Sequence, residues 1–199
     1  MKVFSLILLF SILFIGCAST EEKKDETPVI RATQNDYTES AAKYMPLAVG
    51  NKWLYAVDYI GNKGEMEIAV TGEKDGFYTD NHGGALKVDK RGIRDKERYL
   101  LMFPLNENRE WSSILGIGRK EVRKIVNIDQ DVTTPAGKFE GTIVVETESE
   151  PEKGLVLKSL TYFAVNVGIV KIETMLLDSS KGTLSPQTTT ELKSFTKIK

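Results

Sequence analysis

One cysteine and one histidine limit the chemistry that this chain of 199 residues could perform. A metal site made of several histidines cannot form within one chain, and acylation of Cys17, argued below, removes the thiol of a Cys-His pair. His82 lies in Asn81-His82-Gly83-Gly84, a pattern typical of an exposed turn, and no Gly-x-Ser-x-Gly motif accompanies it. We therefore predict a polar loop position for His82 and no catalytic residue.

Acidic side chains raise the possibility of a calcium site. Asp129 and Asp131 lie near Glu140 and could offer carboxylate oxygens. The Asp-x-Asp-x-Asp-Gly loop that would arrange them is absent, and acids at a solvated strand end have the same pattern. We predict no metal and no cofactor.

The densest basic cluster is Arg119, Lys120, Arg123 and Lys124. On a strand, Arg119 and Arg123 would share one face and the two lysines the other. Such a cluster is typical of a solvated edge that discourages strand pairing between molecules. A second hypothesis is that it contacts an acidic partner, either a glycan or another envelope protein.

The overall charge excludes a nucleic-acid partner. Lysine and arginine total 27 against 28 acidic residues, for a formal net charge of −1, and both signs are interspersed along the chain. This is the pattern of a soluble surface.

The N-terminus predicts an export signal with lipid attachment. Lys2 precedes an uncharged apolar run from Val3 to Ile15, which is short for a bilayer span. Leu13-Phe14-Ile15-Gly16-Cys17 resembles a bacterial lipobox in relaxed form, with Phe14 where leucine is usual. Cys17 would become the acylated N-terminus and would attach the chain to a membrane, while an ordinary cleaved signal and an N-terminal membrane anchor are the alternatives.

Composition divides the chain into three parts. Residues 1–16 form the signal peptide. Residues 17–43 form the lipidated cysteine and a flexible tether, because they are polar and sparse in apolar side chains. Residues 44–199 form one domain, which alternating strands and frequent turns assign to an antiparallel β class, whether sandwich, barrel or curved half-barrel.

Individual strands follow from period-two alternation. Trp53, Tyr55, Val57 and Tyr59 share one face, and a glycine-rich reversal at residues 60–64 begins a hairpin. A strand is favoured over a helix for residues 121–128, and a turn is predicted at residues 134–137. Further strands are expected at residues 155–163, 169–177 and 188–198, with a break at residues 179–186.

Three segments carry a family resemblance. They are Tyr44 to Tyr55, with Pro46-Leu47 and Gly50-Asn51-Lys52-Trp53-Leu54-Tyr55; Thr133 to Phe139, with Pro135-Ala136-Gly137-Lys138-Phe139; and Tyr162 to Lys171, with Ala164-Val165-Asn166-Val167-Gly168. They resemble a loose family of exported or lipid-anchored bacterial β-proteins, mostly without assigned activity. The family usually has proline and glycine at the positions of Val165 and Asn166, and asparagine also tolerates a left-handed backbone. The resemblance implies export and a β fold, and no catalytic residue.

The large aromatics of these segments have two interpretations. Trp53, Tyr55, Phe139 and Phe163 are of a size that anchors a β core. They could instead line a cavity, as in lipid-carrying half-barrels of the bacterial envelope.

Together these features predict a lipid-anchored envelope protein with a non-catalytic β binding module. A carrier of lipid or another hydrophobic ligand is the first alternative, and a hydrolase is the second. Ala18 after the acylated cysteine lacks the aspartate that retains lipoproteins at the inner membrane, so the outer membrane is the expected location.

Overall fold

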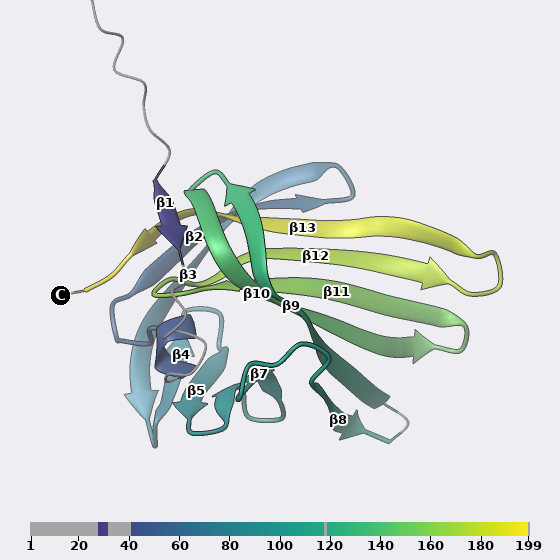
Figure 1. Ribbon diagram of the computed structural model, residues 1–199, viewed down its shortest axis with the longest axis horizontal. Coiled ribbons are helices and arrows are strands. Elements are labelled where there is room, and N and C mark those ends of the chain that lie inside the picture. Colours follow the sequence, from purple (N-terminus) through teal and green to yellow (C-terminus); the bar gives the residue numbers. More distant parts are fainter. Residues whose placement is uncertain (1–27, 32–40, 118, 199) are drawn as a thin grey trace, which may run out of the picture.

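The described part of the protein is an antiparallel β domain. The structure, a computed structural model, describes residues 28–31, 41–117 and 119–198. The main sheet is barrel-shaped and nearly closed, so the predicted class is confirmed (Figure 1). Within the described residues the elements are β1 (Val29–Arg31), η1 (Ala41–Tyr44), β2 (Lys52–Tyr59), β3 (Asn62–Lys74), β4 (Phe77–Asp80), β5 (Ala85–Asp89), β6 (Gly92–Arg94), β7 (Tyr99–Met102), β8 (Glu110–Gly116), β9 (Arg119–Thr134), β10 (Gly137–Glu152), β11 (Leu155–Ala164), β12 (Gly168–Asp178) and β13 (Thr183–Thr196).

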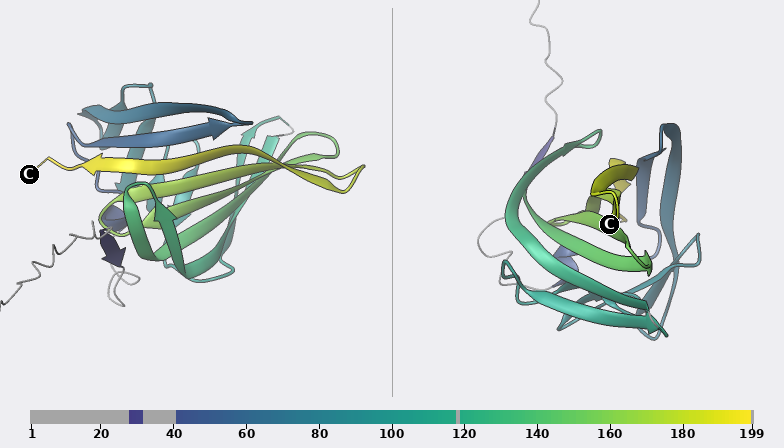
Figure 2. Two further views of the ribbon diagram at one scale, coloured as in Figure 1. Left: turned by 90° about the horizontal axis from the view of Figure 1, so that it is seen from above. Right: turned by 90° about the vertical axis from the view of Figure 1, so that its right-hand side faces the viewer.

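Among the described residues, the main path of the sheet is a meander with one long-range pairing. Its order is β7-β6-β5-β4-β3-β2-β13-β12-β11-β10-β9-β8, in which β13 pairs with β2 and so joins the two halves of the chain. β1 lies off this path and pairs in parallel with the start of β10. Figure 2 shows the sheet curling around, so that the ends of the path approach each other.

Side chains bridge the two ends of the path. The indole Nε1 of Trp111 in β8 donates to the carbonyl oxygen of Tyr99 in β7 at 2.9 Å. Arg98, just before β7, lies 2.7 Å from Glu121 of β9. We call this junction the seam. It brings β7 and β8, the two ends of the strand path, together through side chains and not through a ladder of backbone hydrogen bonds.

The core lies on the inner face of the curled sheet. Trp53 and Tyr55 of β2 are buried, as their alternation predicts, and the Trp53 ring stacks on Phe195 at 5.0 Å between centroids. Cross-strand pairing places Tyr55 opposite Leu192, and Ile143 opposite Phe163. Burying such side chains supplies most of the favourable free energy of folding.

One end of the barrel is covered by η1. This short 3₁₀ helix contacts β5 and β6 on one side and β12 on the other. Its Tyr44 is fully buried, and the backbone N–H of Asn166 donates to the carbonyl oxygen of Lys43 at 2.6 Å. We call this end, which also holds the start of β10 and the β11–β12 turn, the plugged end.

The opposite end carries the turns of four hairpins and is called the hairpin end. The register places the β2–β3, β8–β9, β10–β11 and β12–β13 turns there. The strands of the last two hairpins reach beyond the rest of the sheet (Figure 1). Among the described residues no helix has the length and apolarity needed to cross a membrane.

The structure corrects two sequence-based boundaries. β1 and most of η1 lie within residues 17–43, the range predicted as a tether, so the folded part begins before Tyr44. The strand expected at residues 188–198 begins at Thr183, so the predicted break at residues 179–186 is confined to residues 179–182. The register shifts at Met175, opposite Pro186, and a bulge of this kind accommodates a proline inside a strand. Cys17 and the signal peptide lie outside the described residues.

Candidate functional site

A row of polar side chains runs across successive strands on the inner face, near the hairpin end. Each member lies directly opposite the next one in the register of neighbouring strands. Directly opposed residues point to the same face of a sheet, so these side chains line the inside of the barrel. We define the polar row as Arg123 of β9, Thr147 of β10, Ser159 of β11, Thr174 of β12 and Thr188 of β13. Its flanks are aromatic, because Trp111 lies opposite Arg123 and Tyr59 lies opposite Thr188.

Burial decreases along the polar row. Arg123 and Thr147 are 8% and 9% exposed, whereas the three remaining hydroxyl residues are half-buried. The hydroxyl groups of Ser159 and Thr174 lie 3.0 Å apart and form a hydrogen bond. At the far flank Tyr59 is 56% exposed. The row therefore runs from the interior at the seam to solvent at β2.

A network of ion pairs fixes the buried end of the row. Arg123 Nε lies 2.6 Å from Glu121 Oε1, and Arg98 Nη1 lies 2.7 Å from Glu121 Oε2. Arg98 also pairs with Asp95 at 3.1 Å. Burial lowers the pKa of the Arg123 guanidinium, and the neighbouring Glu121 carboxylate opposes that shift. Two cations and two anions balance, so this network adds no net charge to the inner face.

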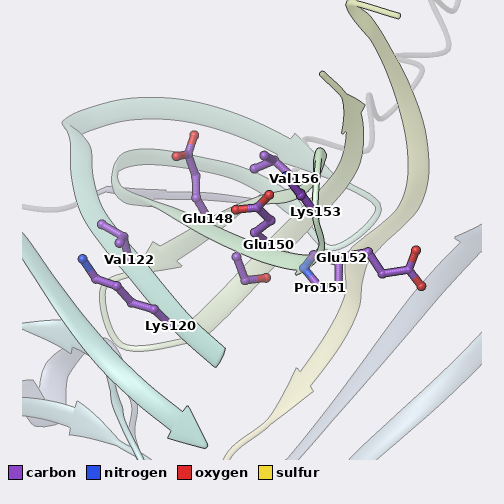
Figure 3. Close-up of a pocket in the computed structure, with 9 residues that line it drawn as sticks. Lys120, Val122, Glu148, Glu150, Pro151, Glu152, Lys153 and Val156 are labelled. Atoms are coloured by element: carbon purple, nitrogen blue, oxygen red, sulfur yellow. The ribbon is translucent and has the colours of Figure 1, made fainter. Parts of the chain in front are cut away.

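An open groove of about 540 Å³ lies at the tip of the β10–β11 hairpin beside the start of β9 (Figure 3). Charged residues of both signs dominate its lining, and a register shift between Ser149 and Glu152 bends the strand there. Glu150 accepts a hydrogen bond from the backbone N–H of Gly154 at 2.8 Å. A lining of this kind suits polar ligands, since a hydrocarbon chain would desolvate the charges. The charged lining residues are Lys120, Glu148, Glu150, Glu152 and Lys153.

The four large aromatics that the sequence singled out all lie in the buried core. Trp53 Nε1 donates to the carbonyl oxygen of Val167 at 2.7 Å, and Tyr55 Oη donates to that of Ile169 at 2.9 Å. Burial raises the pKa of the Tyr55 phenol. These contacts tie β2 to the β11–β12 turn and to the start of β12. Phe139 and Phe163 complete the set.

The candidate acid-base residue His82 and two of the candidate calcium-binding residues, Asp131 and Glu140, have structural partners. The His82 ring nitrogen Nε2 lies 2.8 Å from the carbonyl oxygen of Glu67, in an exposed turn. Lys138 pairs with Asp131 at 3.1 Å and with Glu140 at 2.7 Å. The hydrogen bond from Lys138 lowers the pKa of Asp131. Within the part of the chain that the structure describes, no three His, Cys, Asp or Glu side chains are placed to hold a metal ion.

The basic cluster separates between the two faces of β9. Arg119 and Lys120 are exposed, Lys124 is half-buried, and Arg123 points inward. β9 lies between β8 and β10, so the interpretation of a solvated edge is wrong. An acidic partner for the exposed members stays a prediction.

Sequence reasoning missed the hydroxyl members of the polar row. Thr188-Thr189-Thr190 has no motif, yet the register turns Thr188 and Thr190 inward and Thr189 outward. The alternation of β11 did contain a usable pattern. Ser159 and Thr161 precede the core residue Phe163 at period two, so all three side chains share one face. Counting back from that core residue would have placed hydroxyls inside the barrel.

Comparisons with known proteins add distant similarities. A protein of Bacteroides fragilis NCTC 9343, described as exported and YmcC-like in fold, has a TM-score of 0.49 and 15% identity, covering 75% of this chain and 97% of its own. A protein of Parabacteroides distasonis ATCC 8503, described as a lipoprotein, has a TM-score of 0.40 and 15% identity, covering 77% of this chain and 98% of its own. No family model and no curated protein sequence matches the chain. The family resemblance of the three motif segments stays a prediction.

Proposed function

We propose that this chain is a lipid-anchored cell-envelope protein whose β domain binds a ligand, without catalysis, on its inner face at the hairpin end. The observation that carries the proposal is the polar row. Inward positions of a small β-barrel are normally filled by apolar side chains, and buried polar groups cost free energy. Hydroxyls and an ion pair in this place are better suited to contacting a ligand than to filling the barrel.

The direction of the chain supports this arrangement. β1 begins beside Lys138, so the segment that follows Cys17 enters the domain at the plugged end. From Cys17 to Pro28 an extended chain reaches at most about 40 Å. Acyl chains on Cys17 would attach the protein through the plugged end and leave the hairpin end, with its polar row, facing away from the attachment. We place the protein at the outer membrane because Ala18 follows the acylated residue.

Cys17→Ser tests the anchor. We expect the full-length variant to lose incorporation of radiolabelled palmitate and to leave the membrane fraction, while Ser19→Ala behaves as wild type. Membrane retention of Cys17→Ser after a high-salt wash would overturn the anchor.

Photo-crosslinking in cells tests the binding face while the ligand is still unidentified. A benzoylphenylalanine at position 174 faces inward. One at position 173, also on β12, faces outward, because the Glu173 carboxylate lies 2.8 Å from the Tyr162 hydroxyl on the outer face. We expect an adduct from position 174 and none from position 173. Equal adducts from both positions, or none from position 174, would contradict binding on the inner face.

A further inference from the structure

Resting on the proposed binding at the inner face, we propose that the polar row holds a neutral carbohydrate chain laid across β10–β13. The four hydroxyl residues occupy successive strands, which are about 4.8 Å apart, so the hydroxyls span about 14 Å. This is an extended, repeating surface. It suits a ligand whose own hydroxyls repeat along its length.

Hydrogen-bonding capacity favours a sugar. A Ser or Thr hydroxyl both donates and accepts, as do the hydroxyls of a saccharide, so each contact can form in either direction. Of the row's hydroxyls, those of Ser159 and Thr174 bond to each other at 3.0 Å and retain further donor or acceptor capacity. Half-burial leaves these groups accessible to a ligand from the hairpin end.

The charge balance favours a neutral ligand. Arg123 is the cation nearest the hydroxyls in the register, and its guanidinium is held by Glu121 at 2.6 Å. An anionic ligand would have to compete with that carboxylate for Arg123 and would meet its negative charge. A neutral sugar can accept from the outer N–H groups of the guanidinium while the ion pair stays intact.

The aromatic flanks add contacts of a second kind. Tyr59 is exposed at one end of the row, and Trp111 is fixed at the other by its hydrogen bond to Tyr99. The face of an aromatic ring is electron-rich, and it attracts the polarised C–H groups on the face of a pyranose ring. A carbohydrate presents both C–H faces and hydroxyl edges, which matches aromatic flanks around a hydroxyl centre.

Two other ligand classes fit less well. A hydrocarbon chain would desolvate the hydroxyls and the ion pair and return no hydrogen bond. A peptide gains affinity by adding a strand to a sheet edge, but β10–β13 are interior strands whose backbone groups are already paired with both neighbours. Carbohydrate is therefore the class that the row favours.

Isothermal titration calorimetry on the full-length Cys17→Ser chain tests this inference. The probes are neutral glucan, mannan and galactan hexasaccharides, a hexauronate, phosphatidylglycerol vesicles and an extended decapeptide. Thr174→Val and Thr188→Val remove one hydroxyl each from the row. Thr189→Val removes one from the outer face of the same strand, and circular dichroism confirms that each variant is folded.

We expect at least one neutral hexasaccharide to bind, with affinity lowered about fivefold or more by each of the two inner substitutions and unchanged by Thr189→Val. Binding of the hexauronate, vesicles or peptide in place of every neutral sugar would overturn the inference. So would a neutral sugar that binds wild type and Thr174→Val with the same affinity. Adducts from position 174 in cells, together with failure of every neutral hexasaccharide, would reject carbohydrate while leaving the proposed binding function intact.

Discussion

At the scale of single residues, Trp53 does more than fill space. Its indole is 1% exposed, and it donates to the carbonyl oxygen of Val167 at 2.7 Å, which joins the start of β2 to a turn 114 positions later. The stacked ring of Phe195 covers its face. Hydrophobic burial and a satisfied buried carbonyl thus depend on one side chain.

Trp53→Phe should lower the free energy of unfolding by about 3 kcal/mol, because it leaves the Val167 carbonyl without this donor and opens a small cavity. Urea denaturation measures the loss. Tyr59→Phe, at an exposed aromatic of the same strand, should change stability by no more than about 0.5 kcal/mol. Similar losses in both variants would contradict the assigned role of the indole N–H.

At position 166 the residue type predicts the backbone conformation, whereas the hydrogen-bond partner depends on tertiary structure. Asparagine replaces the glycine that the resembling family usually has, and its φ is +61°, inside the left-handed region. The expectation that asparagine tolerates this turn needed only its side-chain type. The partner of its backbone N–H, the Lys43 carbonyl of η1, could not be read from the local sequence.

At the scale of elements, the β6–β7 hairpin depends on one glycine. Gly92 has φ +151°, and a Cβ placed on it would lie 1.9 Å from the carbonyl oxygen of Leu101 in the paired strand. Gly64 in β3 is a useful contrast, since no atom lies within 4 Å of its hypothetical Cβ. The two glycines therefore have different roles.

We expect Gly92→Ala to cost about 3 kcal/mol of unfolding free energy, because β6 must move away from β7 to relieve the clash. Gly64→Ala should be neutral or stabilising, since it reduces the entropy of the unfolded chain without a clash. The melting temperatures of both variants, measured by thermal unfolding, test this difference. A melting temperature for Gly92→Ala close to that of wild type would refute the close approach of these strands.

Strands were easier to predict than their limits. The alternation around Trp53 and the turn at residues 134–137 were local signals, and both elements formed. The start of β13 was missed because Pro186 reads as a strand breaker, and only the bulge in its pairing with β12 makes room for it. Whether a proline breaks a strand depends on what lies opposite.

At the scale of the whole molecule, the seam decides whether the sheet curls into a barrel. β7 and β8 end the strand path, and their junction depends on the Trp111–Tyr99 hydrogen bond and the Arg98–Glu121 ion pair. Glu121 is 6% exposed and bonds two arginines at once. Removing its charge would leave two poorly compensated cations near the interior.

Glu121→Gln should therefore reduce the free energy of unfolding by about 3 kcal/mol, within the range found when one partner of a buried ion pair is removed. Glu110→Gln, an exposed substitution on the edge strand β8, is the matched control and should have little effect. Guanidinium denaturation followed by the fluorescence of the two tryptophans measures the stability of each variant. A loss for Glu121→Gln no larger than for Glu110→Gln would show that the ion pairs contribute little to closing the seam.

The sequence by itself determined the antiparallel β class, the principal turns and the alternation that places Trp53 and Tyr55 on one face, because alternation and turn chemistry act over a few residues. Only the tertiary structure decided the polar row and the seam. Arg123 and Thr188 are 65 positions apart, and they share a row because four successive registers each align one member of the row with the next. A shift of one residue in any register would turn a strand's hydroxyls to the opposite face. Register is fixed by the packing of the whole barrel, so a local pattern could turn Ser159 inward but could not align it with the hydroxyls of the neighbouring strands.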